Sequence, residues 1–154
     1  MDETQRLSKL FGDLYDGKPW LEITLAGQLG ELSAKQAAHR HGQKWNSIWE
    51  ITNHIIHWRE NVFERVHGKT PQTPQDNYFR PVQDTSEAAW KNTLEKLKES
   101  QRQWRDFLDA IGRETLELSY PANQMSYADH IHGILQHDAY HLGQIAMLAK
   151  HAPD

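Results

Sequence analysis

The sequence contains no cysteine among its 154 residues. This absence excludes disulfide bonds, thiolate nucleophiles and every cysteine-based zinc or iron–sulfur site. Any metal ion bound by this chain must therefore be held by imidazole and carboxylate groups.

Long apolar runs and clusters of basic residues are also missing. No stretch approaches the roughly 18 consecutive apolar residues of a membrane-spanning helix, and the acidic start after Met1 does not resemble a secretion signal. Lys and Arg number 17 against 21 Asp and Glu, which gives a net charge of −4 with no basic run to bind phosphates. We therefore expect a soluble, cytoplasmic protein that binds neither nucleic acid nor membrane.

Histidine and tryptophan are abundant, with ten His and six Trp residues. Because only 38% of the residues are apolar, we expect the large indole rings to form much of the core. The length fits one domain with a sizeable core.

Apolar residues recur at helical spacing in four long stretches. The pattern predicts helices over residues 3–16, from 46 or 47 to about 67, from 85 or 86 to 112, and from 126 to 150. A short helix is expected within 20–32, and Ser33 resembles the N-cap of another. No segment alternates as a β-strand does.

The segment 69–84 has three prolines and no periodicity, so we expect a long connection that can cover a site. Together these features predict an all-α fold, an antiparallel four-helix bundle with a long crossover loop between helices two and three. In such bundles, sites are built from side chains on facing helices.

Three histidines are the main candidates for metal ligands. His137 and His141 are four residues apart in the last helix, so both rings project from one face and can converge on one cation. His54 lies between Ile51 and Ile55 on the apolar stripe of the second helix and should point inward. The alternatives are a surface position for the pair and a neutral core imidazole, bonded to a carbonyl, for His54. Three imidazoles on Zn²⁺ would leave an open position for water or a thiol.

The remaining histidines receive lesser roles. His57 shares its face with Asn53 and Glu60, so we expect it to face water. His130 has nearly the azimuth of His137 but lies about 10.5 Å along the helix, too far for the same ion, and at most lines a pocket mouth. The others lie in polar or terminal segments and are assigned no chemistry: His39, His41, His67, His132 and His151.

Two carboxylates are candidates to support such a site. Asp138 falls within the apolar stripe of the last helix and needs a donor, either an imidazole N–H or an indole N–H such as that of Trp58. Glu50 precedes His54 by one turn and is a weaker candidate to orient that ring.

Three further residues of the last helix are of interest. Tyr140 and Gln144 follow its histidine side, where they either contact a substrate or take part in packing. Gly143 costs about 1 kcal/mol of helix propensity relative to alanine, which indicates close approach of another helix or a dimer contact.

Three motifs follow one another along the chain: Leu14-Tyr-Asp-Gly-Lys-Pro-Trp20, Ser47-Ile-Trp-Glu-Ile-Thr-Asn-His54 with Trp58, and Gln136-His-Asp-Ala-Tyr-His-Leu-Gly-Gln-Ile145. Together they resemble the DinB/YfiT-like superfamily of DNA-damage-inducible four-helix bundles. The resemblance spans nearly the whole chain and implies a single DinB-like domain over residues 1–154. It also implies a divalent metal, usually zinc or nickel, held here by His54, His137 and His141.

The superfamily includes thiol-dependent S-transferases, a mycothiol-dependent maleylpyruvate isomerase and many members classed as metal-dependent hydrolases by inference only; homodimers are common. We therefore expect a metal-dependent enzyme that acts on a small molecule by thiol transfer or hydrolysis. The alternative is a noncatalytic, dimeric metal- or ligand-binding bundle that serves as a sensor or scaffold. A di-iron carboxylate site is excluded because the sequence lacks paired Glu-x-x-His motifs.

This chain departs from the superfamily pattern at two positions. Relatives often have His where Leu21 and Asn46 stand here, so any role of those histidines at the pocket rim is absent. A thiol nucleophile would have to come from a low-molecular-weight cofactor, since the chain has no cysteine.

Overall fold

The computed structural model describes residues 1–153, so the last residue of the expected domain, Asp154, lies outside the described part. The long helices are α1 (Glu3–Tyr15), α4 (Ile48–Arg65), α5 (Glu87–Ala110) and α7 (Tyr127–Ala149). Short helices α2 (Leu25–Gly30), α3 (Ala34–Ala38) and α6 (Arg113–Leu116) lie in the connections, and residues 1–153 contain no strand. The predicted all-α bundle is confirmed.

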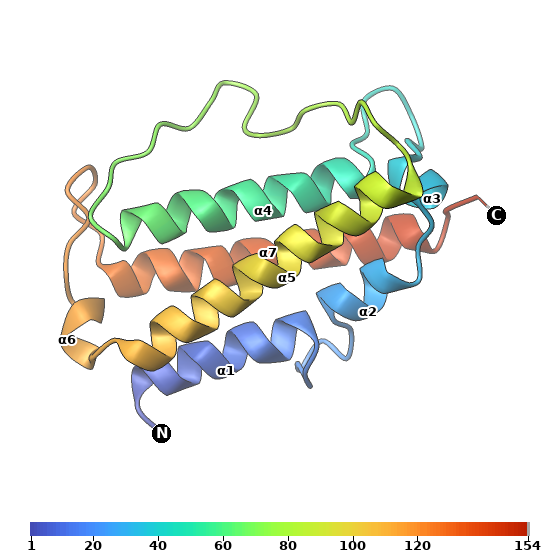
Figure 1. Ribbon diagram of the computed structural model, residues 1–154. Helices are drawn as coiled ribbons and strands as arrows, with labels where there is room; N and C mark the ends of the chain where they lie inside the picture. Colours follow the sequence, from blue (N-terminus) through green and yellow to red (C-terminus); the bar gives the residue numbers. More distant parts are fainter. Residues whose placement is uncertain (154) are drawn as a thin grey trace.

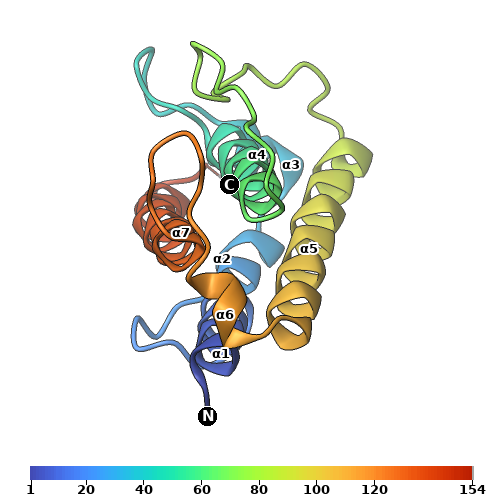
Figure 2. The ribbon, with the colours of Figure 1, turned by 90° about the vertical axis from the view of Figure 1, so that its left-hand side faces the viewer.

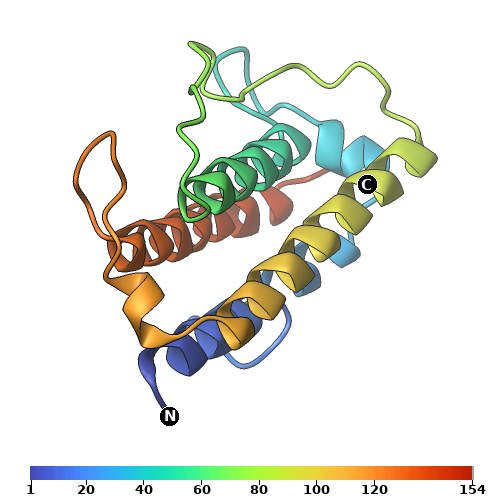
Figure 3. The same ribbon diagram turned by 60° about the vertical axis from the view of Figure 1, so that its left-hand side comes forward.

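The four long helices lie side by side, with α4 and α5 running in one direction and α1 and α7 in the other (Figure 1). Viewed along their axes, α7 and α5 flank α4, and α1 lies on the opposite side of the bundle (Figure 2). Because α4 and α5 are parallel, the chain must return along the length of α4 before α5 begins. Residues 66–86 make this crossover as an arch over α4 (Figure 3).

Polar caps define where the long helices begin. Ser47 caps α4 and Ser86 caps α5, which decides between the alternatives left open by the sequence. In α4 and α7 the capping serine also takes part in a capping box with the acidic side chain three residues on. Ser33 caps α3 in the same way, as predicted, with Gln36 as its partner.

The short helix expected within residues 20–32 is present as α2, and α6 was not predicted because it is only four residues long. One expectation about the interior needs correction. The tryptophans are only partly in the core, since Trp20 and Trp45 are 98% and 55% exposed in connections that the bundle does not cover. The fully buried indoles are those of Trp49, Trp90 and Trp104.

Within residues 1–153, none of the helices is both long enough and apolar enough to span a membrane.

Candidate metal centre

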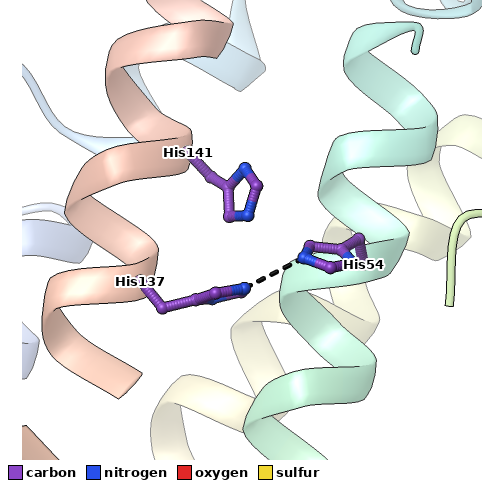
Figure 4. Close-up of side chains that lie close together, drawn as sticks. All are labelled: His54, His137 and His141. Carbon is purple, nitrogen blue, oxygen red and sulfur yellow. Dashed lines mark hydrogen bonds between the residues drawn. The ribbon is translucent and has the colours of Figure 1, made fainter. Parts of the chain in front are cut away.

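Three histidines meet between the antiparallel helices α4 and α7 (Figure 4). His54 comes from α4, and His137 and His141 come from successive turns of α7. One ring nitrogen of each lies within 4.8 Å of those of the other two, and Nε2 of His54 is 2.9 Å from Nε2 of His137. His54 and His141 are buried, at 2% and 5% exposure. The inward orientation predicted from helical periodicity is confirmed.

The outer nitrogens of two of these rings are held by hydrogen-bond acceptors. Nδ1 of His54 donates to the backbone carbonyl of Asn77 at 2.7 Å, and Nδ1 of His141 donates to Oε1 of Gln144 at 2.7 Å. A neutral imidazole has one N–H, so these bonds leave Nε2 of both rings as a lone-pair donor. Metal-ligating histidines are oriented in this way.

Burial keeps the two enclosed rings neutral. Desolvation lowers the pKa of His54 to about 4, although the hydrogen bond to Asn77 works in the opposite direction. Desolvation also lowers the pKa of His141, against the effect of its bond to Gln144. Imidazole must be deprotonated to bind a metal, so near pH 7 both rings are in the state that a metal ion requires.

The crossover connection covers one side of the cluster. The ring of Phe79 stacks on His54 with centroids 3.9 Å apart, and the side-chain carbonyl of Asn77 accepts a hydrogen bond from Nε1 of Trp58 at 3.0 Å. Asn77 and Tyr78 both have left-handed φ angles, 51° and 63°, which is costly for tyrosine. The connection therefore covers His54; that it covers a functional site stays a prediction.

Asp138 is buried as predicted, but its donor is an arginine. Nε of Arg59 donates to Oδ2 of Asp138 at 2.6 Å, and both side chains are 0% exposed. Nη1 of Arg59 also donates to Oε1 of Gln101 at 3.0 Å. The expected bond from the Trp58 indole is wrong because that indole turns to Asn77. Neither Arg59 nor Gln101 was among the residues selected from the sequence.

Glu50 does not orient His54. Its carboxylate pairs with Arg40 and accepts a hydrogen bond from the backbone N–H of Ser47. Burial works to raise the pKa of Glu50, but the bonds from Arg40 and Ser47 outweigh it and lower the pKa. Within residues 1–153, the hydrogen bonds of this carboxylate therefore go to the start of α4 and to Arg40, and not to the histidine cluster.

The sequence predicted that His57 and His130 would not bind the same ion as the three histidines, and the structure places both outside the cluster. His57 is half-exposed, bonds to Glu60 at 3.1 Å and stacks on Tyr78. His130 is buried against Tyr120, with its ring centroid 4.9 Å from that of the tyrosine. Its suggested place at a pocket mouth stays a prediction.

Tyr140 and Gln144 form a chain of bonds along α7. Nε2 of Gln144 donates to the Tyr140 hydroxyl at 3.0 Å while its carbonyl accepts from His141. The expected close approach of another helix to Gly143 is wrong within residues 1–153, because a Cβ added there would meet nothing within 4 Å. Gly143 lies on the outer face of α7.

A cavity of about 420 Å³ lies beside Gln144. Its walls come from the connection before α4, where Trp45 and Asn46 stand, and from Met147 on α7. Asn46 thus lines this cavity. The cavity offers room for a small molecule next to the bond that holds His141.

The fold and this cluster define a four-helix bundle with a candidate three-histidine metal site between two antiparallel helices. A profile of the DinB superfamily matches residues 24–145, a span that includes all three histidines, and the chain belongs to this superfamily. Comparisons with curated proteins and with solved structures give no match.

Proposed function

We propose that the protein is a divalent-metal-dependent enzyme that acts on a small molecule, with His54, His137 and His141 as the metal ligands. The observation that carries the proposal is the convergence of three imidazoles, two of which have their outer nitrogens held by acceptors. Imidazole donors suit zinc and nickel. No carboxylate replaces any of the three rings, so the ligand set is neutral.

A divalent ion held by His54, His137 and His141 would supply Lewis-acid activation of a water or thiol toward an electrophile, because three neutral ligands would leave its charge in place. Several residues of the chain hold the ligand rings in position and enclose the proposed site. Asn77 and Gln144 hold two ligand rings, Phe79 shields His54 from water on one face, and the cavity beside Gln144 is large enough for a small substrate. Thiol transfer with a low-molecular-weight thiol and hydrolysis are the two reactions proposed.

The homodimer implied by the superfamily stays a prediction. Tyr140 and Met147 are 65% and 67% exposed on α7, and an exposed apolar surface supports association between copies. Sedimentation equilibrium of the purified chain measures this directly.

Metal content tests the ligand set. In protein purified without chelator and then offered zinc or nickel, His54→Ala, His137→Ala and His141→Ala should each lose most of the bound metal, because two imidazoles compete poorly with water. The half-exposed His57 is the matched control from the same helix, and His57→Ala should bind metal like the parent. Circular dichroism confirms that each variant is helical. Metal retained by His54→Ala but lost from His57→Ala would contradict the assignment.

Turnover separates the enzyme from the noncatalytic alternative. The metal-loaded protein is mixed with a small electrophile and bacillithiol, mycothiol or glutathione, and hydrolysis is followed in parallel without a thiol. A reaction that His54→Ala abolishes supports the enzyme and identifies the reaction type. Metal binding without any turnover would favour a sensor or scaffold.

A further inference from the structure

The third ring of the cluster differs from the other two in its outer nitrogen. Nδ1 of His137 and Oδ1 of Asp138 are both buried, and neither has a hydrogen-bond partner within residues 1–153. The two atoms are 3.6 Å apart, just beyond hydrogen-bonding length. Buried polar atoms without partners cost free energy, so a pair of them side by side calls for an explanation.

The position of one proton accounts for this gap. His54 uses its single N–H to bond the carbonyl of Asn77, which leaves its Nε2 as an acceptor. That acceptor is 2.9 Å from Nε2 of His137, so His137 must supply the hydrogen between them. A neutral His137 then has no hydrogen on Nδ1. Nδ1 of His137, which then has no hydrogen, and the carboxylate oxygen are both acceptors, so no hydrogen bond forms between them.

We propose that Asp138 is a positioning residue whose carboxylate accepts a hydrogen bond from Nδ1 of His137 when the metal binds. The inference rests on the proposed function, since it requires a metal at the three histidines. In the metal-free protein, His137 carries its hydrogen on Nε2 and donates it in a hydrogen bond to Nε2 of His54. On metal binding, His137 loses the proton on Nε2 to solvent and gains one on Nδ1, which donates to Oδ1 of Asp138. One proton leaves and one arrives, so the ring stays neutral.

Arg59 prepares Asp138 for this role. It holds the other carboxylate oxygen, Oδ2, at 2.6 Å and is itself fixed through Gln101 on α5. Both members of the ion pair are 0% exposed, so neither solvent nor a surface side chain competes for Oδ1. The carboxylate therefore has one oxygen occupied and one left for His137. With that bond made, all three ligand rings would have their outer nitrogens held.

Nitrogen NMR of the parent protein tests the proposal without any substitution. In ¹⁵N-histidine-labelled protein, long-range proton–nitrogen spectra should place the hydrogen of His137 on Nε2 when metal-free. After one equivalent of zinc, it should be on Nδ1, with slow solvent exchange and a downfield shift. A hydrogen on Nδ1 in the metal-free protein, protonation of both nitrogens there, or a rapidly exchanging Nδ1 proton in the zinc form would overturn it.

A pair of matched variants gives a second readout. Asp138→Asn and Glu50→Gln each remove the charge of a buried carboxylate paired with arginine, but only Asp138 faces a ligand ring. Zinc affinity should fall about 10- to 100-fold in Asp138→Asn and stay at the parent value in Glu50→Gln. The downfield shift of the His137 Nδ1 proton in the zinc form should also be smaller in Asp138→Asn and unchanged in Glu50→Gln.

The possible failures can be told apart. If the parent binds no zinc, the proposed function and this inference both fall. If the parent binds zinc and Asp138→Asn binds it equally tightly, only the role of Asp138 is refuted. Equal losses in both variants would mean that charge removal, rather than the contact with His137, weakens the site, and this also refutes it. If Asp138→Asn does not fold, the spectra of the parent still decide.

Discussion

Two neighbouring parts of the interior are built on different principles. The aromatic cluster joins α1, α4 and α5 and packs rings with centroids 5.0 to 6.1 Å apart; it consists of Phe11, Phe63, Trp104 and Phe107. The polar network, which joins α4, α5 and α7, is held by directional bonds and consists of Arg59, Gln101 and Asp138. Removing apolar side chains lowers the free energy of unfolding in proportion to the apolar area that is lost. Removing the partner of a buried charge lowers it sharply in a single substitution.

The two parts meet at Arg59, whose guanidinium carbon lies 5.5 Å from the ring centroid of Phe11. The histidine cluster adjoins the polar network through His137 and Asp138. Damage to the polar network should therefore reach the metal site, and damage to the aromatic cluster should change stability without changing metal affinity.

The largest effect is expected from Arg59→Met. This substitution leaves Asp138 buried without a cation, which should lower the free energy of unfolding by about 3–5 kcal/mol. Urea denaturation of the metal-free protein measures the loss. The double variant Arg59→Met, Asp138→Leu should recover much of it because no unpaired charge remains. A double variant as unstable as the single one would show that the charge is not the cause.

Leu108→Ala examines the apolar side of the comparison. Leu108 is 0% exposed and lies one turn beyond Trp104 on α5. Removing its side chain should cost about 2–5 kcal/mol, from lost burial and the cavity left behind. Zinc affinity, measured by titration at a temperature where the variant is folded, should equal that of the parent. A weakened zinc affinity would mean that the two parts of the interior are not independent.

Gln101→Leu should have a smaller effect. It removes the acceptor for Nη1 of Arg59, a hydrogen bond to a charged group whose loss costs about 1.5 kcal/mol at the lower end of the usual range. It also removes the amide nitrogen of Gln101, which is buried without a partner in the described chain, so the loss should stay small. Urea denaturation of Gln101→Leu and Arg59→Met in parallel checks which variant loses more free energy of unfolding. A loss equal to that of Arg59→Met would place the main support of Asp138 at Gln101.

The parts of the site that follow helical periodicity could be predicted from the sequence. The period of the helix fixes which side chains share a face, so it predicts that His137 and His141 lie on one face of α7 and that His54 points inward from α4. That all three bind one metal ion is what the resemblance to the superfamily implies. The cap of α7, Ser126, could also be predicted, and the caps of α4 and α5 could be narrowed to two neighbouring residues each, because capping chemistry is local.

The supporting contacts could not be predicted in the same way. Asn77 and Phe79 lie in an aperiodic connection whose path depends on tertiary contacts and on two left-handed residues. Arg59 did leave a signal, since it falls four residues after Ile55 and three before Val62 on the buried stripe of α4. A charged side chain normally favours a surface position, and only its pairing with Asp138 across the helix interface makes the burial of Arg59 tolerable.

The smallest expected effect concerns a buried histidine far along α7 from the cluster. Burial lowers the pKa of His130, and the positive charge of Arg65 lowers it further, against the opposing effect of Asp129. The folded chain therefore keeps His130 neutral at a pH where the unfolded chain begins to protonate it, near 6.5. Stability that is present above this pH is lost as the pH falls through the lowered pKa of the folded state.

His130→Gln removes this titration and should make the stability of the chain less sensitive to acid. The free energy of unfolding, measured by urea denaturation at several pH values below about 7, should fall less steeply in the variant than in the parent. A chelator is kept in both samples, so that His54, His137 and His141 are metal-free and contribute equally to the two curves. The gap between the slopes should close above about pH 7, where His130 is neutral in both the folded and unfolded states. A variant with the parent's slope throughout would show that the burial of His130 carries no penalty for its charged form.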